Sequence, residues 1–336
     1  MIPGAPVESR WLRAKPRRSL PARVLKDIVG TAFPRCQLVD VQPLADGFRN
    51  ANFRLRLDSI PGFVVLRIYE HDPSLCAKEV DLLNLIKNSV PVPTIIHAEP
   101  EGLNEIPPFV FMHYVEGISL RELQRNEDSG SMAQAAYSAG QTLAVISRTT
   151  FTKSGWLGPG PAVSAPLLEG ANSGPRFVDL CLASANSQLY LGSELTDQIH
   201  TLVWSYASQL AAMDDERCLV HGDSGKRNLF VRRVKGEWRV AAVLDWEFAI
   251  SGFPLTDVGH FLRYECASCP VAEPHFSEGF LHAGGRLPDE WRRLARVLDL
   301  IALCEILTRD ELPHDVVAEL VDLVQAAVEN RDPRID

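Results

Sequence analysis

The alternation of apolar and polar residues predicts a strand-rich region near the start of the chain. Residues 52–57 alternate with a period of two, which is typical of a half-buried strand. Residues 63–69 are apolar almost throughout, so we expect a central strand there, and residues 59–62 have the composition of a hairpin turn. A further apolar strand is predicted at 109–114. Together these runs indicate a small, mostly β region with room for one embedded helix.

The period changes to that of a helix in the remaining chain. Residues 74–87 carry Val80, Leu83 and Ile86 at helical spacing, and Pro91 and Pro93 end this pattern. Residues 152–176 are rich in Gly and Pro and are expected to be irregular. Beyond residue 117 the pattern predicts helices at 131–148, 195–213, 291–307 and 316–328.

A β-hairpin interrupts this helical half and carries polar residues at both ends. Its predicted strands are 229–234 and 238–244, so that Asn228 precedes the first strand and Asp245 follows the second. A hairpin returns its two ends to one edge, and we therefore expect Asn228 and Asp245 to lie close together. Carboxylate and amide oxygens are ligands that Mg²⁺ accepts together with phosphate oxygens. Asp223 would then face a hydroxyl beside a metal-bound phosphate, an arrangement suited to phosphoryl transfer.

Composition limits the kinds of partner. The 336 residues are 46% hydrophobic and 23% charged, which is typical of a folded globular protein. No apolar run reaches the roughly 18 residues that a membrane helix needs, and residues 1–10 lack the layout of a secretory signal. We therefore expect a soluble cytoplasmic protein without a membrane partner. The formal net charge of −9 argues against a nucleic-acid partner.

Charge and cysteine are unevenly distributed along the chain. Residues 1–35 hold eight Lys or Arg against two acids, as in a tether to an anionic surface or in a solvated tail. Residues 261–336 hold 15 acids against eight Arg, which suits a cationic substrate or ordinary acidic surface helices.

Seven cysteines, an odd number, indicate reduced thiols. Cys266 and Cys269 form a Cys-x-x-Cys without a second pair at zinc-ligand spacing, so we interpret them as incidental.

The catalytic-loop residues resemble those of a known family. His221-Gly222-Asp223, with Asn228 five residues later and Leu244-Asp245-Trp246-Glu247 beyond, resembles the signature of the aminoglycoside phosphotransferases, which are distant relatives of the protein kinases. This resemblance implies that Asp223 is the catalytic base and that Asn228 and Asp245 bind magnesium. It also implies that His221 braces the loop and that Asp257 supports it.

The resemblance implies an α+β, two-lobed protein-kinase-like fold. We expect a basic segment at 1–37, a nucleotide-binding lobe at 38–115 and a helical catalytic and substrate-binding lobe at 116–336. The implied reaction moves the γ-phosphoryl group of ATP, with GTP also compatible, to a hydroxyl of a small molecule. The acceptor is either an aminoglycoside-like antibiotic or a metabolite such as an amino alcohol or a sugar. The alternative is a catalytically idle nucleotide-binding or scaffold protein, and the oligomeric state is not predicted.

Nucleotide-binding residues follow from the same resemblance. Gly47 and Asn50 match a family Gly-x-x-Asn turn that closes over phosphates. Arg67 stands where most kinases have Lys, which keeps the positive charge, and Glu79 on the following helix is its expected partner. Simpler alternatives are a surface charge on the strand for Arg67 and a solvated helix position for Glu79. The adenine is expected to be held by the backbone carbonyl of His113 and the backbone amide of Val115, near residues 112–117.

Lys226 departs from the small or Pro residue that many relatives carry in this loop. Two roles are open for it. Its ammonium could be a catalytic charge that offsets the transferred phosphoryl oxygens. It could equally be a solvated cation of the loop.

Overall fold

The computed structural model describes residues 20–44, 50–103, 105–167, 170, 172–265 and 271–329. Gly47, Cys266 and Cys269 lie outside these residues, as does most of the basic segment. The chain divides into two compact units. Among the described residues, the smaller unit comprises those up to 116 together with Gly158–Ala162, and the larger unit comprises the others. Within the described ranges, no helix has the length and apolar character required to cross a bilayer.

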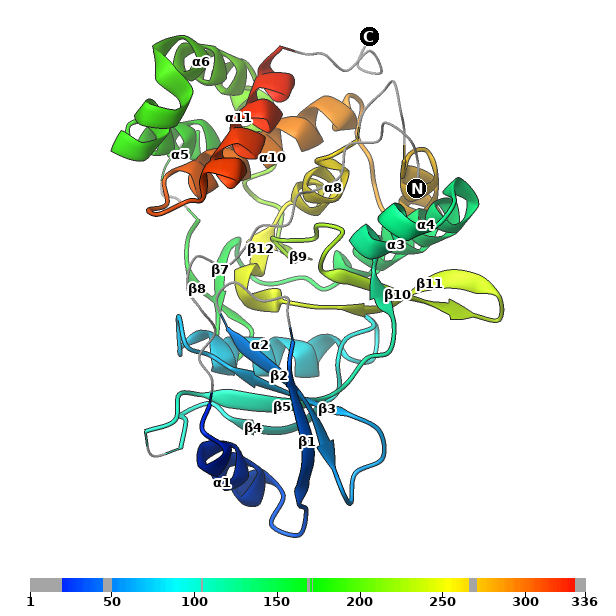
Figure 1. Cartoon of the computed structure of the whole chain (residues 1–336). Helices are drawn as coiled ribbons and strands as arrows, with labels where there is room; N and C mark the ends of the chain where they lie inside the picture. Colours follow the sequence, from blue (N-terminus) through cyan, green and yellow to red (C-terminus); the bar gives the residue numbers. More distant parts are fainter. Residues whose placement is uncertain are drawn as a thin grey trace. The chain divides into compact units, whose positions relative to one another are not determined.

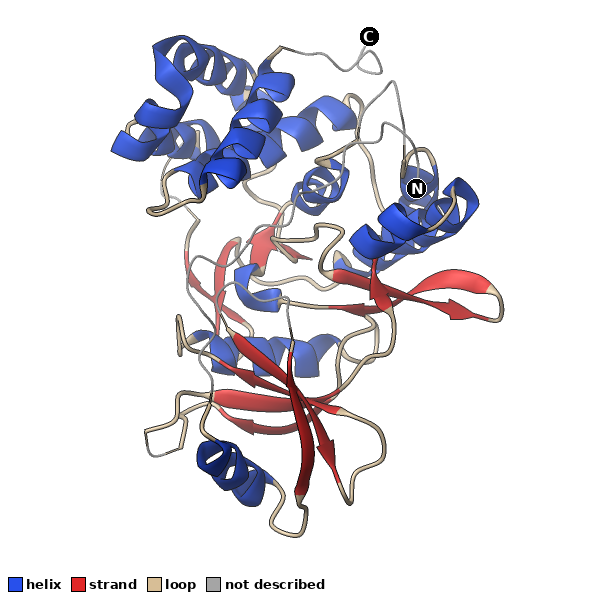
Figure 2. Cartoon of the chain, viewed as in Figure 1, coloured by secondary structure: helices blue, strands red, loops and turns tan. Residues whose placement is uncertain are grey.

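The smaller unit is built on a five-stranded antiparallel sheet (Figure 2). The strands predicted at 52–57, 63–69 and 109–114 are confirmed, and the apolar strand of 63–69 is the central one. The strand at Ile95–Glu99 was not predicted, because all five of its residues are half-buried and so show no alternation. The strand order is β1 (Leu38–Pro43), β2 (Ala51–Leu57), β3 (Val64–Ile68), β5 (Phe109–His113) and β4 (Ile95–Glu99).

Two helices cover opposite faces of this sheet (Figure 1). Side chains alternate between the faces of a strand, so neighbouring residues of β3 face different helices. Leu66 packs in the core beneath Ile28 of α1 (Ala22–Ala32). The next residue, Arg67, faces the other way and pairs with Glu79 of α2 (Leu75–Ile86). The predicted 74–87 helix is thus confirmed, and α1 joins the core of the smaller unit.

The larger unit contains two small sheets. β10 (Leu229–Val234) pairs with β11 (Glu237–Val243) as the predicted hairpin, with β6 (Ile118–Ser119) on its other side. The second sheet has the order β8 (Ala162–Ala165), β7 (Gly155–Gly158), β12 (Ile250–Gly252) and β9 (Cys218–Val220). The expectation that 152–176 is irregular was therefore wrong in part. Two short strands lie within it, and β7 pairs with β12, which is distant in the sequence.

Side chains of α4 (Ser129–Ile146) satisfy the free edge of β11. Gln134 Oε1 accepts from the amide of Trp238 at 3.1 Å, and Ser138 Oγ accepts from the amide of Val240 at 3.0 Å. An uncovered edge strand would leave these donors open to pairing with another chain. The hairpin is consequently held from the side by a helix. The same unit includes α3 (Leu120–Asn126), the short 3-10 turn η1 (Trp246–Phe248), α8 (Leu255–Leu262) and α9 (His275–His282).

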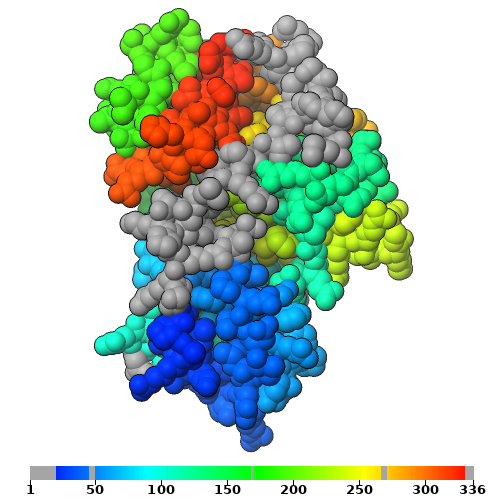
Figure 3. Space-filling view, viewed as in Figure 1, coloured from blue at the N-terminus to red at the C-terminus, as the bar shows by residue number. Residues whose placement is uncertain are grey.

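The remaining helices of the larger unit pack around a separate apolar core. The helices predicted at 291–307 and 316–328 are confirmed as α10 (Trp291–Leu307) and α11 (His314–Val328). The predicted 195–213 helix was wrong in extent. It is α6 (Ala185–Ser205) followed by α7 (Ala207–Ala211), and Gly192 kinks α6 with φ 69° and ψ 171°. α6 and α11 lie side by side on the surface (Figure 3), and α5 (Ser173–Leu182) completes the layer.

Candidate active site

The hairpin brings Asn228 to the strand end that leads into Asp245, as predicted. Leu229 pairs with Val243 in the antiparallel register, and Leu244 donates its amide to the Asn228 carbonyl at 2.9 Å. Asp245 has φ 68° and ψ 68°, a left-handed conformation that strains a residue other than glycine. Such strain persists where the surrounding structure fixes it, and it is concentrated at functional sites.

The Asn228 side chain is locked to Asp223. Its Nδ2 donates to the Asp223 carbonyl at 2.8 Å and to Asp223 Oδ2 at 2.9 Å. Because both partners only accept, the amide nitrogen must face Asp223, and Asn228 Oδ1 keeps its acceptor role. An amide oxygen and the Asp245 carboxylate form an oxygen donor set that fits Mg²⁺. The predicted base and the first predicted metal ligand therefore hold each other in place.

His221 braces this loop as a neutral imidazole. Its Nε2 lies 2.9 Å from the Leu244 carbonyl oxygen, which can only accept, so Nε2 carries the proton. Its Nδ1 then accepts the backbone amide of Asp223 at 3.1 Å. The ring connects the residue before Asp245 with Asp223 itself, which confirms the predicted bracing role.

Asp257 supports the opposite side of the loop. Its carboxylate accepts the amides of His221 at 2.7 Å and Gly222 at 3.0 Å, and its carbonyl accepts the Ser224 hydroxyl at 2.8 Å. Asp257 is only 3% exposed, and a buried carboxylate needs such donors. The predicted support by Asp257 is confirmed.

Gly222 is required by the path of the loop. Its φ is +79°, and a Cβ built there would lie 2.3 Å from the Phe248 carbonyl oxygen. There is no room for a side chain at this position, and the backbone has a left-handed conformation that only glycine adopts readily.

Lys226 is buried rather than solvated. Its side chain is 4% exposed, and Nζ lies 3.4 Å from Oε1 of Glu265, which is 3% exposed. The alternative of a solvated loop cation is thus wrong. The role of a charge that offsets phosphoryl oxygens stays a prediction.

The smaller unit holds the Arg67–Glu79 pair that was expected. Arg67 Nε lies 3.3 Å from Glu79 Oε2, with side-chain exposures of 9% and 4%, so the alternatives of a surface charge and a solvated helix position are both wrong. Tyr69 donates its hydroxyl to the same Glu79 Oε2 at 2.5 Å. Burial, together with the charge of Glu79, raises the pKa of Tyr69 well above its usual value, so the phenol stays protonated and remains a donor.

The other predicted nucleotide-binding residues of this unit are also located. Asn50 is buried immediately before β2. His113 ends β5, and its amide donates to the Thr94 carbonyl at 2.9 Å. The Val115 amide follows this strand and donates to no backbone carbonyl within the described part of the chain. These roles in nucleotide binding stay predictions.

No group of three or more His, Cys, Asp or Glu side chains in the described ranges is arranged to hold a metal ion. Asn228 and Asp245 alone offer too few ligands for a stable octahedral site. A magnesium ion held here would depend on the phosphate oxygens of a nucleotide.

Comparison with known sequences identifies the family. The sequence model of the Phosphotransferase enzyme family matches residues 40–297, which is more than half of the chain. The chain belongs to this family. The family resemblance that the catalytic loop indicated is thereby confirmed, and the matched residues extend over both units.

Solved structures show the kinase-like fold of this family member. Aminoglycoside phosphotransferase APH(4)-Ia matches with a TM-score of 0.66 at 16% identity, covering 92% of this chain and 99% of that one. The GDP complex of wild-type aminoglycoside 2'-phosphotransferase-IIIa matches with a TM-score of 0.67 at 18% identity, covering 92% and 98%. At this identity the likeness establishes the fold alone.

Curated relatives match over shorter stretches. Acyl-CoA dehydrogenase family member 11 of Gallus gallus is 28% identical over 158 residues, which is 46% of this chain and 18% of that protein. The protein of the same name from Mus musculus is 44% identical over 64 residues, 19% of this chain and 8% of its own length. The chain therefore spans less than a fifth of the length of either relative.

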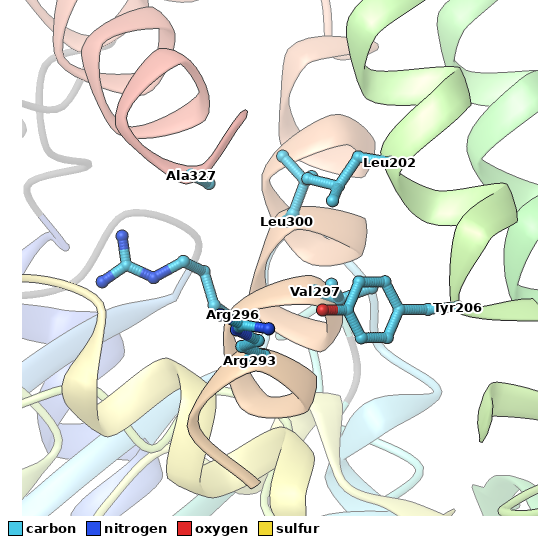
Figure 4. Close-up of a pocket in the computed structure, with 7 residues that line it drawn as sticks. All are labelled: Leu202, Tyr206, Arg293, Arg296, Val297, Leu300 and Ala327. Atoms are coloured by element: carbon cyan, nitrogen blue, oxygen red, sulfur yellow. The ribbon is translucent and has the colours of Figure 1, made fainter. Parts of the chain in front are cut away.

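A small pocket of the larger unit lies apart from the predicted catalytic set (Figure 4). None of the predicted catalytic or metal-binding residues lines it, so it is not the candidate active site. Its lining comes from α6, α10 and α11 and from the residue between α6 and α7: Leu202, Tyr206, Arg293, Arg296, Val297, Leu300 and Ala327.

Two residues of these networks were missed by sequence reasoning. Tyr69 was assigned only to an apolar strand, and Glu265 was counted only in an acidic region. Tyr69 lies two residues after Arg67, so the alternation of β3 already places it on the face of Arg67. No comparable signal exists for Glu265, which is 39 residues from its partner Lys226.

Proposed function

We propose that this protein transfers the γ-phosphoryl group of ATP to a hydroxyl group of a small molecule. The observation that carries this proposal is the hydrogen-bonded pair of Asp223 and Asn228, with Asp245 following the residue that bonds to the Asn228 carbonyl. The Asp223 carboxylate is oriented by Asn228, so it can accept the proton of an incoming hydroxyl. Family membership supports the reaction class.

Asn228 and Asp245 would hold Mg²⁺. When bound, this ion neutralises phosphate charge during transfer. Asn228 Oδ1 is the atom that points to this role, because its Nδ2 is already engaged with Asp223. The strained backbone of Asp245 is a further sign of a functional constraint at this position.

ATP would be held in the smaller unit by Arg67, with Glu79 fixing the guanidinium and Tyr69 fixing Glu79. We also assign phosphate contacts to Gly47 and Asn50 and base contacts to the backbone of His113 and Val115. Backbone contacts distinguish adenine from guanine poorly, so GTP is a second candidate donor. Complexes of family structures contain AMP-PNP, ADP or GDP, which supports a nucleotide of either kind.

For the acceptor we favour a metabolite over an aminoglycoside. Structures named as complexes with hygromycin B and kanamycin share only 17–18% identity with this chain. The relative from Mus musculus reaches 44% over 64 residues, and its name refers to acyl-CoA metabolism. A hydroxylated acid or a hydroxyacyl thioester is therefore a candidate acceptor beside amino alcohols and sugars.

The buried acids of residues 261–336 give no support for a cationic acceptor. The three carboxylates that are buried in its described part are each paired with a cation of the protein. Glu265 pairs with Lys226, Glu273 with Arg292 at 2.8 Å, and Asp299 with Arg263 at 2.7 Å. These acids serve the interior of the larger unit.

The experiment that tests the proposal is an acceptor screen followed by mass spectrometry. The protein is incubated with Mg²⁺ and ATP or GTP and with aminoglycosides, amino alcohols, sugars, hydroxy acids and hydroxyacyl thioesters. We expect one class to gain a phosphoryl group in a Mg²⁺-dependent way. Nucleotide binding without any phosphorylated product across the panel would favour the catalytically idle alternative.

A further inference from the structure

The buried pair of Lys226 and Glu265 is a charge interaction of the catalytic loop that the proposed chemistry does not use. The two side chains are 4% and 3% exposed, and Nζ lies 3.4 Å from Oε1. The ring of Phe261 lies 5.9 Å from Nζ and adds an apolar surrounding. Two charges buried this deeply persist only when they are paired and further hydrogen-bonded.

The further hydrogen bonds come from three consecutive backbone amides. Glu265 accepts from Val271 at 3.0 Å, from Ala272 at 3.0 Å and from Glu273 at 3.4 Å. Successive amides that converge on one anion form a nest, which fixes the backbone that supplies them. The conformation of 271–273 therefore depends on the charge of Glu265, and that charge is stabilised by Lys226.

The same line of contacts continues to two helices. Glu273 accepts the amide and the hydroxyl of Ser277, both at 3.0 Å, in the first turn of α9. It also accepts from Arg292 of α10 at 2.8 Å. A change at Lys226 can thus reach the starts of α9 and α10 through 271–273.

This network adjoins Asp223. Lys226 is three residues from Asp223 in the same loop. Burial lowers the pKa of Arg263, two residues before Glu265, but the charge and hydrogen bonds of Asp299 raise it overall, with smaller contributions that include the charge of Asp223. Through Lys226 and Glu265, the end of α8 and the segment 271–273 are thus connected to the loop that carries the predicted base.

We propose that Lys226 is a positioning residue that acts through Glu265 to fix the segment 271–273 as one wall of the acceptor site. The proposal rests on the phosphotransferase function given above. In this role Lys226 helps to place the acceptor, and its charge does not act on the transferred phosphoryl oxygens.

Hydrogen exchange at the amides of 271–273 tests this proposal without a known acceptor. In K226M the nest loses its supporting charge, and we expect these amides to exchange at least about tenfold faster. K226R keeps the charge and should retain most of the protection. Lys235 is exposed in the β10–β11 turn, so K235M is the matched control and should leave the three amides unchanged.

The substitution K226M should not affect nucleotide binding. Binding of AMP-PNP with Mg²⁺ to K226M should stay within about twofold of wild type, because Lys226 acts on the acceptor side. Once the screen supplies an acceptor, its KM should rise about tenfold in K226M with the KM for ATP nearly unchanged. Should K226M fail to fold, E265Q carries the test, since an amide group in the nest places N–H donors against N–H donors.

The proposal would be overturned if K226M left hydrogen exchange at 271–273 unchanged and lost transfer without a change in the KM for the acceptor. That result would favour a role in which the charge of Lys226 acts on the phosphoryl group. A failure of the proposed function would be seen differently. The screen would then give no product, while the exchange data would still show whether Lys226 holds the segment.

Discussion

At the scale of single residues, the site is defined by atoms that have one possible role. A carbonyl cannot donate, so the Leu244 carbonyl fixes the proton of His221 on Nε2, and the Asp223 carbonyl fixes the orientation of Asn228. These assignments need only donor and acceptor chemistry. They make Asp223 and Asn228, the predicted base and a predicted metal ligand, a single hydrogen-bonded unit, and a change at one is expected to disturb the other.

Tyr69 is predicted to tune nucleotide binding. Y69F removes the hydroxyl that donates to Glu79 and leaves the pair with Arg67 less well oriented. A lost hydrogen bond to a charged group is worth about 1.5–3 kcal/mol, so binding of ATP should weaken about tenfold or more. Isothermal titration measures this. Y190F, at a half-buried tyrosine of α6, is the control and should bind ATP as wild type does.

His260 is predicted to make stability depend on pH. Burial lowers its pKa to about 4, Asp299 and Asp257 raise it, and Arg263 and His221 lower it. The unfolded histidine takes up a proton below its usual pKa of about 6.5 while the folded one stays neutral, so stability falls as pH drops from about 6.5 towards 4. The slope is about 1.4 kcal/mol per pH unit, or about 2 kcal/mol between pH 7 and pH 5.

Urea unfolding at several pH values checks this. H260Q should flatten the slope, whereas H314Q, at an exposed histidine that begins α11, should keep it. An equal slope in wild type and H260Q would mean that another group titrates on unfolding.

At the scale of elements, close approaches of backbone decide which glycines matter. A Cβ on Gly140 of α4 would lie 2.0 Å from the Phe276 carbonyl oxygen of α9, and one on Gly279 of α9 would lie 2.0 Å from the Tyr137 carbonyl oxygen of α4. These two helices touch through their glycines and tolerate no side chain at the contact. The apolar pattern of α4 was visible in the sequence, but its partner α9 was not predicted. Helix α9 is too short for its apolar pattern to be recognised in the sequence, and the role of Gly279 is evident only from its contact with α4.

The catalytic loop contains a matched pair of glycines for testing its geometry. G222A places a methyl group 2.3 Å from the Phe248 carbonyl oxygen at φ +79° and should destabilise the protein by about 1–3 kcal/mol and reduce transfer. G225A meets no atom within 4 Å and should leave the protein close to wild type. Thermal unfolding and the transfer assay compare the two. Equal behaviour of the two variants would contradict the assigned loop path.

At the scale of the whole molecule, the sequence predicted the hairpin and the loop because each depends on residues close together in the chain, and the fold class followed from the family resemblance of that loop. The strand β2 and the helices α10 and α11 also have clear periodicity. The sequence did not predict contacts made by distant residues, such as Glu265 with Lys226 or β7 with β12. Nor did it predict that the buried acids after residue 261 form ion pairs with cations of the protein. The cytoplasmic location stays a prediction.

Magnesium binding is predicted to require a nucleotide. Asn228 and Asp245 supply too few ligands on their own, and no larger cluster of His, Cys, Asp or Glu ligands exists within the described residues. Mg²⁺ alone should leave the melting temperature unchanged, while Mg²⁺ with ATP should raise it in proportion to the nucleotide occupancy. D245N should lose the magnesium part of this shift. A shift with Mg²⁺ alone would indicate a different metal site.

The most direct test of the account is transfer of radiolabelled phosphate from γ-labelled ATP to the acceptor found in the screen, comparing wild type with D223A. D223A removes the carboxylate that accepts the hydroxyl proton, so transfer should fall by about 10²–10⁴-fold while Mg²⁺–ATP binding persists. Transfer by D223A at the wild-type rate would contradict the assignment of Asp223 as the base.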